Sequence, residues 1–116
     1  MQYIIGSREL TPQDSDLIAV LDIAIGIDAA KLNPITGDYA GNPAVYAWIT
    51  IEGVSVRFKI DGSDPITLVD GHLLGAGDTL ELFGIDALSN FRMVREDGSE
   101  SPIAQVSIFW PGRRIQ

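Results

Sequence analysis

The chain has 116 residues, no cysteine and a formal net charge of −8. This length suits one domain with a core of its own, and the lack of cysteine excludes a disulfide framework. A nucleic-acid binder needs a basic stripe to displace counterions from phosphates, so the acidic balance argues against nucleic acid as a partner.

Residues 1–16 are expected to form a peripheral N-terminal arm. The opening letters MQYIIGSREL lack the basic start and sustained apolar run of a secretory signal, so none is expected. Tyr3, Ile4 and Ile5 could add a short strand. Residues 11–14 (TPQD) have the composition of a turn or of a helix start.

Residues 20–27 are predicted to form a half-buried strand. Apolar side chains alternate there with polar or small ones: Leu21, Ile23, Ile25 and Ile27 against Asp22, Ala24, Gly26 and Asp28. A helix over residues 15–25 is the alternative, but β-branched enrichment favours the strand. The most apolar stretch, residues 17–30, is 14 residues long and contains two aspartates. It is too short for a membrane span, and no membrane contact is expected.

Residues 31–43 (KLNPITGDYAGNP) lack periodicity and predict a loop, which Tyr39 is expected to pin to the domain. Residues 44–60 predict a hairpin of two strands with a tight turn at Glu52-Gly53. Its apolar positions alternate strictly: Val45, Ala47, Ile49 and Ile51, then Val54, Val56, Phe58 and Ile60. One face of each strand is therefore expected in a core, and the other toward water or a partner.

The second half of the chain alternates turns with short strands. Turns are expected at residues 61–65, 71–78 and 96–102, a strand around Leu80 and Leu82, one helical turn at 85–90 and a short strand at 91–95. The closing strand, 103–110, has Ala104, Val106, Ile108 and Trp110 on one face.

Strands at this spacing, separated by turn signals, are typical of a sandwich or barrel. We therefore predict an all-β fold, an Ig-like or jelly-roll-type β-sandwich of about seven to eight antiparallel strands. It comprises residues 17–110 and is followed by a basic tail, residues 111–116.

Candidate catalytic and metal-binding motifs are incomplete. His72 is the lone histidine, and no G-x-S-x-G elbow presents a nucleophile to it, so a hydrogen-bonded turn residue is favoured. Residues 61–64 (DGSD) offer alternating oxygen ligands for calcium, but Pro65 and the lack of a distal Glu favour an Asx-type turn. Residues 71–78 (GHLLGAGD) lack the Lys-Ser/Thr ending of a phosphate loop. We expect no catalytic residue, no metal, no cofactor and no enzymatic activity.

Three aromatic residues are candidates for a contact surface. Tyr46 and Trp48 lie opposite the apolar set of their strand, so they are exposed anchors if that face meets solvent and core residues if it is covered. Together with Trp110 they could form a platform that stacks on sugars. A protein-contact surface is favoured, and a carbohydrate-binding or receptor-recognition module is the alternative.

The motifs of the central region carry a resemblance to a known family. Residues 47–82 (AWITIEGVSVRFKIDGSDPITLVDGHLLGAGDTLEL), then LSNFRMVRED and VSIFW, resemble a small virion-associated structural protein that recurs in tailed-bacteriophage genomes. The matching positions are Arg57, Asp61, Gly62, Pro65, Gly71, His72, Leu74, Gly77, Asp78, Phe91, Arg92 and Arg95. The resemblance covers residues 44–110 and carries no catalytic residue. It departs from the family where Ile66, not threonine, follows the proline.

The resemblance implies a structural component of a phage particle, most simply a capsid decoration or cement protein or a head–tail accessory. Its partners would be the major capsid protein or head–tail components, with homo-oligomers expected, and its location the virion after synthesis in the host cytoplasm. The expected partner-binding residues are Tyr3, Ile4, Ile5, Tyr46, Trp48, Arg113 and Arg114.

A second set of residues is expected to fix the turns of the sandwich. Its members are Arg57, Asp61, Gly62, Pro65, Gly71, His72, Asp78, Arg92 and Arg95. The strand arginines are expected to fork onto Asp61, Asp78 or Asp86 within the chain, rather than to face a neighbouring subunit.

Overall fold

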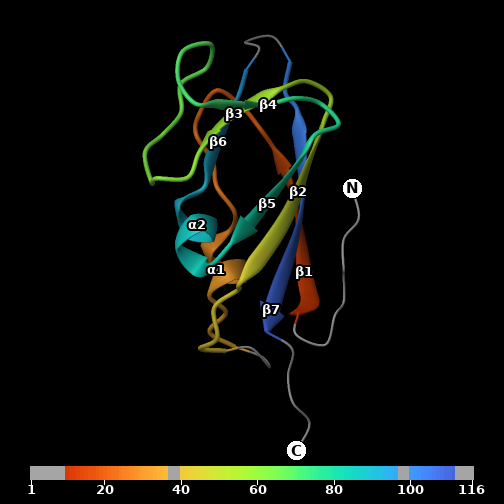
Figure 1. Cartoon of the computed structure of the whole chain (residues 1–116), viewed down its shortest axis with the longest axis vertical. Coiled ribbons are helices and arrows are strands. Elements are labelled where there is room, and N and C mark those ends of the chain that lie inside the picture. Colours follow the sequence, from red (N-terminus) through yellow and green to blue (C-terminus); the bar gives the residue numbers. More distant parts are fainter. Residues whose placement is uncertain (1–9, 37–39, 97–99, 112–116) are drawn as a thin grey trace, which may run out of the picture.

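The structure, a computed structural model, describes residues 10–36, 40–96 and 100–111 (Figure 1). This part of the chain forms seven strands and two short helices. In chain order they are β1 (Leu10–Ala19), α1 (Ala29–Leu32), β2 (Tyr46–Glu52), β3 (Val56–Lys59), β4 (His72–Leu74), β5 (Thr79–Phe83), α2 (Ile85–Asn90), β6 (Arg92–Arg95) and β7 (Ile103–Pro111). None of the helices described is long and apolar enough to cross a membrane.

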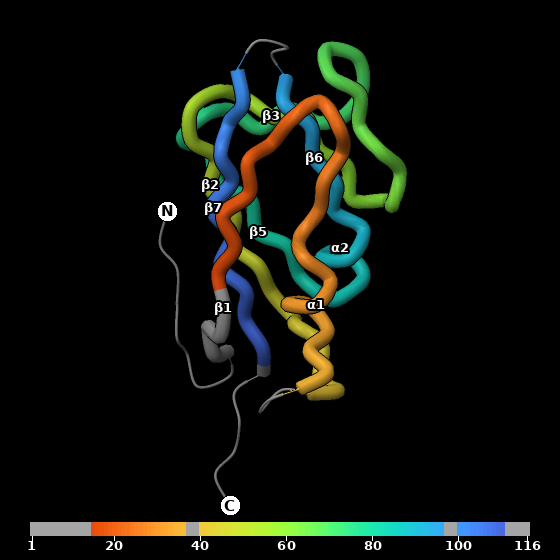
Figure 2. Tube along the Cα trace, turned by 180° about the vertical axis from the view of Figure 1, so that it is seen from behind, coloured from red at the N-terminus to blue at the C-terminus, as the bar shows by residue number. Residues whose placement is uncertain are grey.

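The strands form two antiparallel sheets. The four-stranded sheet has the order β1-β7-β2-β5, and the three-stranded sheet the order β4-β3-β6. Figure 2 shows β1, β7 and β2 on one side of the molecule and β6, with the loop that follows β3, on the other. The prediction of an all-β sandwich is therefore confirmed.

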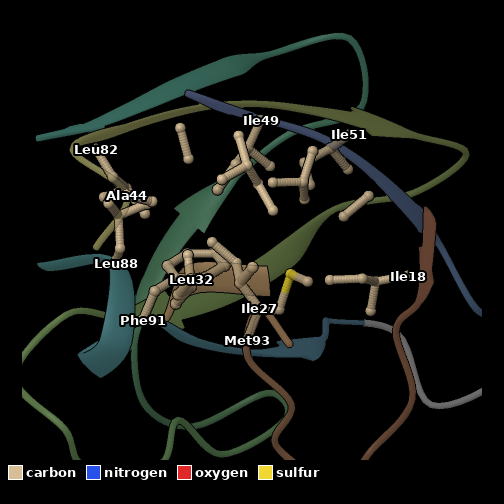
Figure 3. Packing of buried hydrophobic residues seen from close by; sticks show 14 of the residues in the cluster. Ile18, Ile27, Leu32, Ala44, Ile49, Ile51, Leu82, Leu88, Phe91 and Met93 are labelled. Carbon is tan, nitrogen blue, oxygen red and sulfur yellow. The ribbon is translucent and has the colours of Figure 1, made fainter. Parts of the chain in front are cut away.

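The core fills the space between the two sheets. From β7 it takes the predicted set, Ala104, Val106, Ile108 and Trp110, and from β2 it takes Ala47, Ile49 and Ile51. Figure 3 shows Ile49 and Ile51 facing Phe91 and Met93 from the opposite layer. Leu32 of α1 and Leu88 of α2 are also buried in it. Each such aliphatic side chain stabilises the fold by about 1.5–3 kcal/mol on burial.

The hairpin predicted for residues 44–60 is wrong. β2 pairs with β5 and β7, whereas β3 pairs with β4 and β6, so the chain passes from one sheet to the other at residues 53–55. Ala47, Ile49, Ile51 and Val56 are buried as predicted, but Phe58 is only half-buried and Ile60 is exposed. Alternation predicts which face of a strand is covered, but it does not predict which strands pair.

The continuous strand predicted for residues 20–27, its helical alternative and the turn predicted for 11–14 are also wrong. β1 already runs from Leu10 to Ala19, so residues 10–16 pair with β7 although we expected them in the arm. After Ala19 the chain leaves this sheet and runs beside β6, with the Arg95 N–H donating to the Leu21 carbonyl (2.8 Å) and a bridge between Ile25 and Met93. This change of sheet interrupts the continuous pairing that a strand requires.

Two shorter segments also differ from expectation. β4 occupies part of residues 71–78, for which the glycines predicted a turn throughout. The predicted 31–43 loop begins inside α1, where the Asp28 side chain accepts a hydrogen bond from the Ala30 N–H (3.0 Å) and caps the helix. Tyr39 lies outside the described residues.

Candidate binding surface

The outer face of the four-stranded sheet carries a row of aromatic side chains. Tyr46 lies in register with Phe83 on one side and Phe109 on the other, with ring centroids 5.0 and 5.1 Å away. Its hydroxyl donates to Glu81 Oε2 (3.1 Å), and the side chain is 6% exposed. The interpretation of Tyr46 as an exposed anchor is therefore wrong, because its neighbours cover it. Trp48, on the same face, is half-buried.

The three-residue sugar platform is not formed. Trp110 packs into the core on the opposite side of the sheet from Trp48. The aromatic residue of the outer face that is most open is Phe83, at 67% exposure. Sequence reasoning missed Phe83, although its position supplied a signal: it follows Leu82 on the face shared with Thr79 and Glu81, which points away from the core.

The segment between β1 and α1 carries a stripe of exposed aliphatic residues. We expected Leu21, Ile23 and Ile25 to face the core, yet all three are exposed, with Ile23 at 76%. Of the predicted apolar set only Ile27 is buried, and Val20, at the other end of this segment, is buried as well. The hydrogen bonds to β6 hold the backbone between them so that the alternate aliphatic side chains point outward. With two alanines, Ala19 and Ala24, they line a shallow apolar hollow.

A second group of exposed aliphatic residues adjoins this stripe. Ile66, Leu68 and Val69 lie in the loop between β3 and β4, and Val69 is 71% exposed. The Thr67 hydroxyl donates to the Arg95 carbonyl (2.8 Å), and the Arg95 N–H donates to the Leu21 carbonyl (2.8 Å). Both segments therefore meet at the end of β6, on the side of the molecule seen in Figure 2. We call Leu21, Ile23, Ile25, Ile66, Leu68 and Val69 the apolar patch.

The strand arginines form ion pairs within the chain, but not with the expected carboxylates. Instead of Asp61, Asp78 and Asp86, the partners are Glu96 for Arg57, Asp64 for Arg92 (3.8 Å) and Asp22 for Arg95 (3.9 Å). Because β6 lies beside β3, the residue that follows β6, Glu96, reaches Arg57 at the start of β3. Arg57 also donates to the Gly71 carbonyl (2.9 Å) and so attaches the β3–β4 loop to the sheet.

The β3–β4 loop is organised by its own polar side chains. The N–H (3.0 Å) and hydroxyl of Ser63 donate to Asp61 Oδ1, and these donors lower the pKa of the Asp61 carboxyl. Lys59 Nζ lies 2.7 Å from Asp70 Oδ2, and a hydrogen bond to that carboxylate raises the pKa of Lys59. Pro65 is buried beneath the loop. Residues 61–64 thus form the expected Asx-type turn.

The remaining residues expected in turns have local roles. His72 is the first residue of β4 and not a turn residue as expected. It is exposed, with its ring centroid 5.4 Å from that of Phe58, and Gly62 lies beside the Asn90 side chain. Asp78 Oδ2 accepts a hydrogen bond from the Gly75 N–H (2.8 Å). In the part of the chain that the structure describes, no group of three or more histidine or acidic side chains is arranged to hold a metal ion.

Five of the predicted partner-binding residues, Tyr3, Ile4, Ile5, Arg113 and Arg114, lie outside the described residues. No family model matches the chain, and neither a curated protein nor a solved structure matches it.

Proposed function

We propose that the chain is a non-enzymatic structural protein of a tailed-phage virion, which decorates or cements the capsid or serves at the head–tail junction. The observation that carries the proposal is the apolar patch. Adjoining exposed aliphatic side chains mark sites of protein contact, because their hydration is unfavourable in the isolated molecule. The resemblance of its central motifs to those of virion-associated proteins supports the same interpretation.

The chemistry of the patch suits adhesion. Each methylene group removed from water contributes about 0.8 kcal/mol, so even a partial covering of Ile23 and Val69 favours a complex. A stable interface buries about 800 Å² on each partner, which is more than six side chains provide. We therefore place the patch at the apolar centre of a larger interface, with Asp22 and Arg95 among its polar contacts. The net charge of −8 would keep decorated particles apart in solution.

The test is cosedimentation of the labelled protein with particles of the phage that encodes it. The double variant Ile23→Ser, Val69→Ser should bind at least about tenfold more weakly, which corresponds to about 1.4 kcal/mol. Ile35→Ser is the matched control, since Ile35 is 90% exposed but lies outside the patch. Circular dichroism should show that both variants remain folded. If the double variant binds as tightly as the unchanged protein, the patch is not part of the interface. If mass spectrometry finds no copy of the protein in purified particles, the proposed function is overturned.

The chain ends provide a second test of the same function. Deleting residues 1–9 or 112–116 removes no residue of a described strand, because β1 begins at Leu10 and β7 ends at Pro111. If Tyr3, Ile4, Ile5, Arg113 and Arg114 contact the particle, each deletion should weaken cosedimentation of a protein that circular dichroism shows to be folded. A truncated protein that decorates particles normally would contradict a role for the ends.

A carbohydrate-binding or receptor-recognition module is the second candidate function. The observation that favours it is that Trp48 and Phe83 share one face of the sheet. It predicts a change in tryptophan fluorescence on titration with sugars that is lost in Trp48→Phe. Trp110 would not respond, because it is buried in the core.

A further inference from the structure

The described strands leave four sheet edges, and three of them carry features that hinder pairing with another chain. The β6 edge is covered by residues 21–25, and β4 is three residues long. On β1, Pro12 has no N–H and a register shift follows it. Lys31 Nζ also donates to the Ser15 carbonyl of that strand (2.7 Å). Short strands, prolines, bulges and lysines are the means by which proteins protect sheet edges.

The fourth edge, that of β5, has none of these features. Within the described residues, β5 pairs with β2 alone. The hydrogen bonds that bracket this pairing run from the Gly84 N–H to the Val45 carbonyl (2.8 Å) and from the Ile51 N–H to the Asp78 carbonyl (3.2 Å). Because bonded positions alternate along an antiparallel strand, Leu80 and Leu82 bond to β2. The backbone N–H and C=O groups of Glu81 and Phe83 therefore face the open edge.

The side chains beside this edge specify the charge of an incoming strand. Glu81 is half-buried and accepts the Tyr46 hydroxyl, and no described cation forms an ion pair with its carboxylate. On β2 its direct neighbour is Trp48, which carries no charge. A strand added to β5 would place one side chain directly opposite Glu81, at a distance where opposite charges attract. Phe83 would supply apolar contact next to it.

We propose that the β5 edge binds an extended segment of a partner protein as an added antiparallel strand, with a lysine or arginine opposite Glu81. Strand addition of this kind takes its affinity from backbone hydrogen bonds and its specificity from alternate side chains. A second copy of the chain fits less well, because full-length pairing of β5 with itself would set Glu81 against Glu81. Such a strand would belong to the partner in the proposed adhesion, and to that extent it rests on the proposed function. The β5 edge itself does not require that the partner be a virion protein.

The test uses the full chain, labelled with ¹⁵N, and two short capped peptides in which valine alternates with threonine around a central lysine or a central glutamate. The lysine peptide should shift the amide signals of Glu81 and Phe83, and the glutamate peptide should bind up to about fivefold more weakly. In Glu81→Gln this difference should disappear. Phe83→Pro should abolish binding, since it removes an N–H at the open edge and none that bonds to β2. Phe83→Ala, which keeps that N–H, is its matched control.

Three results would overturn the inference. They are the absence of shifts at Glu81 and Phe83 up to the solubility limit of the lysine peptide, equal binding of the two peptides, and larger shifts at β1 or β4. A dimer of the free protein that Phe83→Pro dissolves would assign the edge to a second copy instead. Because the assay contains no particles, its failure leaves the cosedimentation test of the apolar patch unaffected.

Discussion

Replacing Gly71 by alanine should destabilise the fold much more than the same change at Gly77. Gly71 lies where the β3–β4 loop returns to β4 and has φ of +123°. A Cβ atom there would lie 3.0 Å from Pro65 Cβ, 3.1 Å from Arg57 Cβ and 3.2 Å from the Phe58 carbonyl oxygen. Gly77 has φ of +85° and nothing within 4 Å of the same atom, so it isolates the backbone contribution.

The expected difference follows from two contributions at Gly71 and one at Gly77. A side chain at positive φ costs about 1–2 kcal/mol near the left-handed region, and about 1–3 kcal/mol in the sparsely populated region beyond it. Crowding of a packed site adds about 1–3 kcal/mol. Gly71→Ala should therefore lower the free energy of unfolding by about 2–6 kcal/mol, and Gly77→Ala by about 1–2 kcal/mol. A domain of this size has about 5–15 kcal/mol in total.

Urea denaturation followed by circular dichroism and tryptophan fluorescence measures both variants on one scale. The slope of unfolding free energy against urea should stay constant, so the midpoints report stability directly. Equal midpoints for the two variants would mean that the atoms around Gly71 move aside without any loss of stability. The close packing of the loop against β3 would then be refuted.

Three further predictions concern the core, the loop and the patch. Phe91→Ala should lower the free energy of unfolding by about 3–5 kcal/mol in urea denaturation, because it empties a fully buried site; a loss below about 1 kcal/mol would contradict that burial. Ser63→Ala should raise the pKa of Asp61 toward its ordinary 3.8 in a carboxyl ¹³C NMR titration. The folded pKa of Asp61 is lowered, so its stabilisation is present above pH 3.8 and is lost as pH falls through the folded pKa, and the variant should lose less on acidification. Thr67→Val should lower the free energy of unfolding by about 0.5–1.5 kcal/mol in thermal unfolding, because the hydrogen bond to the Arg95 carbonyl is lost. An unchanged midpoint would show that this bond does not hold the β3–β4 loop against β6.

The strands with a strict period of two could be predicted from sequence. In β7 every second residue from Ala104 to Trp110 is buried, and the same rule places Ile49 in the core. The segments after Gly84 and Asn90 were also predicted with the right type, since α2 and β6 are short and bounded by turn residues. Local pattern suffices where one face of an element meets the core and the other does not.

The binding surface could not be predicted in the same way, because it depends on which strands pair. Leu21, Ile23 and Ile25 alternate as regularly as the residues of β2, yet they point outward, since the chain changes sheets after Ala19. Tyr46 is covered by Phe83 and Phe109, which are distant in sequence and become neighbours through the sheet register. Alternation fixes a side chain relative to its own strand, and tertiary contacts decide which side is buried.

The position of β7 has a consequence for synthesis. It lies between β1 and β2, although it leaves the ribosome after every other described strand. Until it arrives, neither flanking strand has this neighbour, and the apolar side of β2 is incompletely covered. Contacts of such sequence separation slow folding and prolong the exposure of aggregation-prone intermediates. Translation pauses or truncations before residue 103 should therefore yield chains that depend on chaperones.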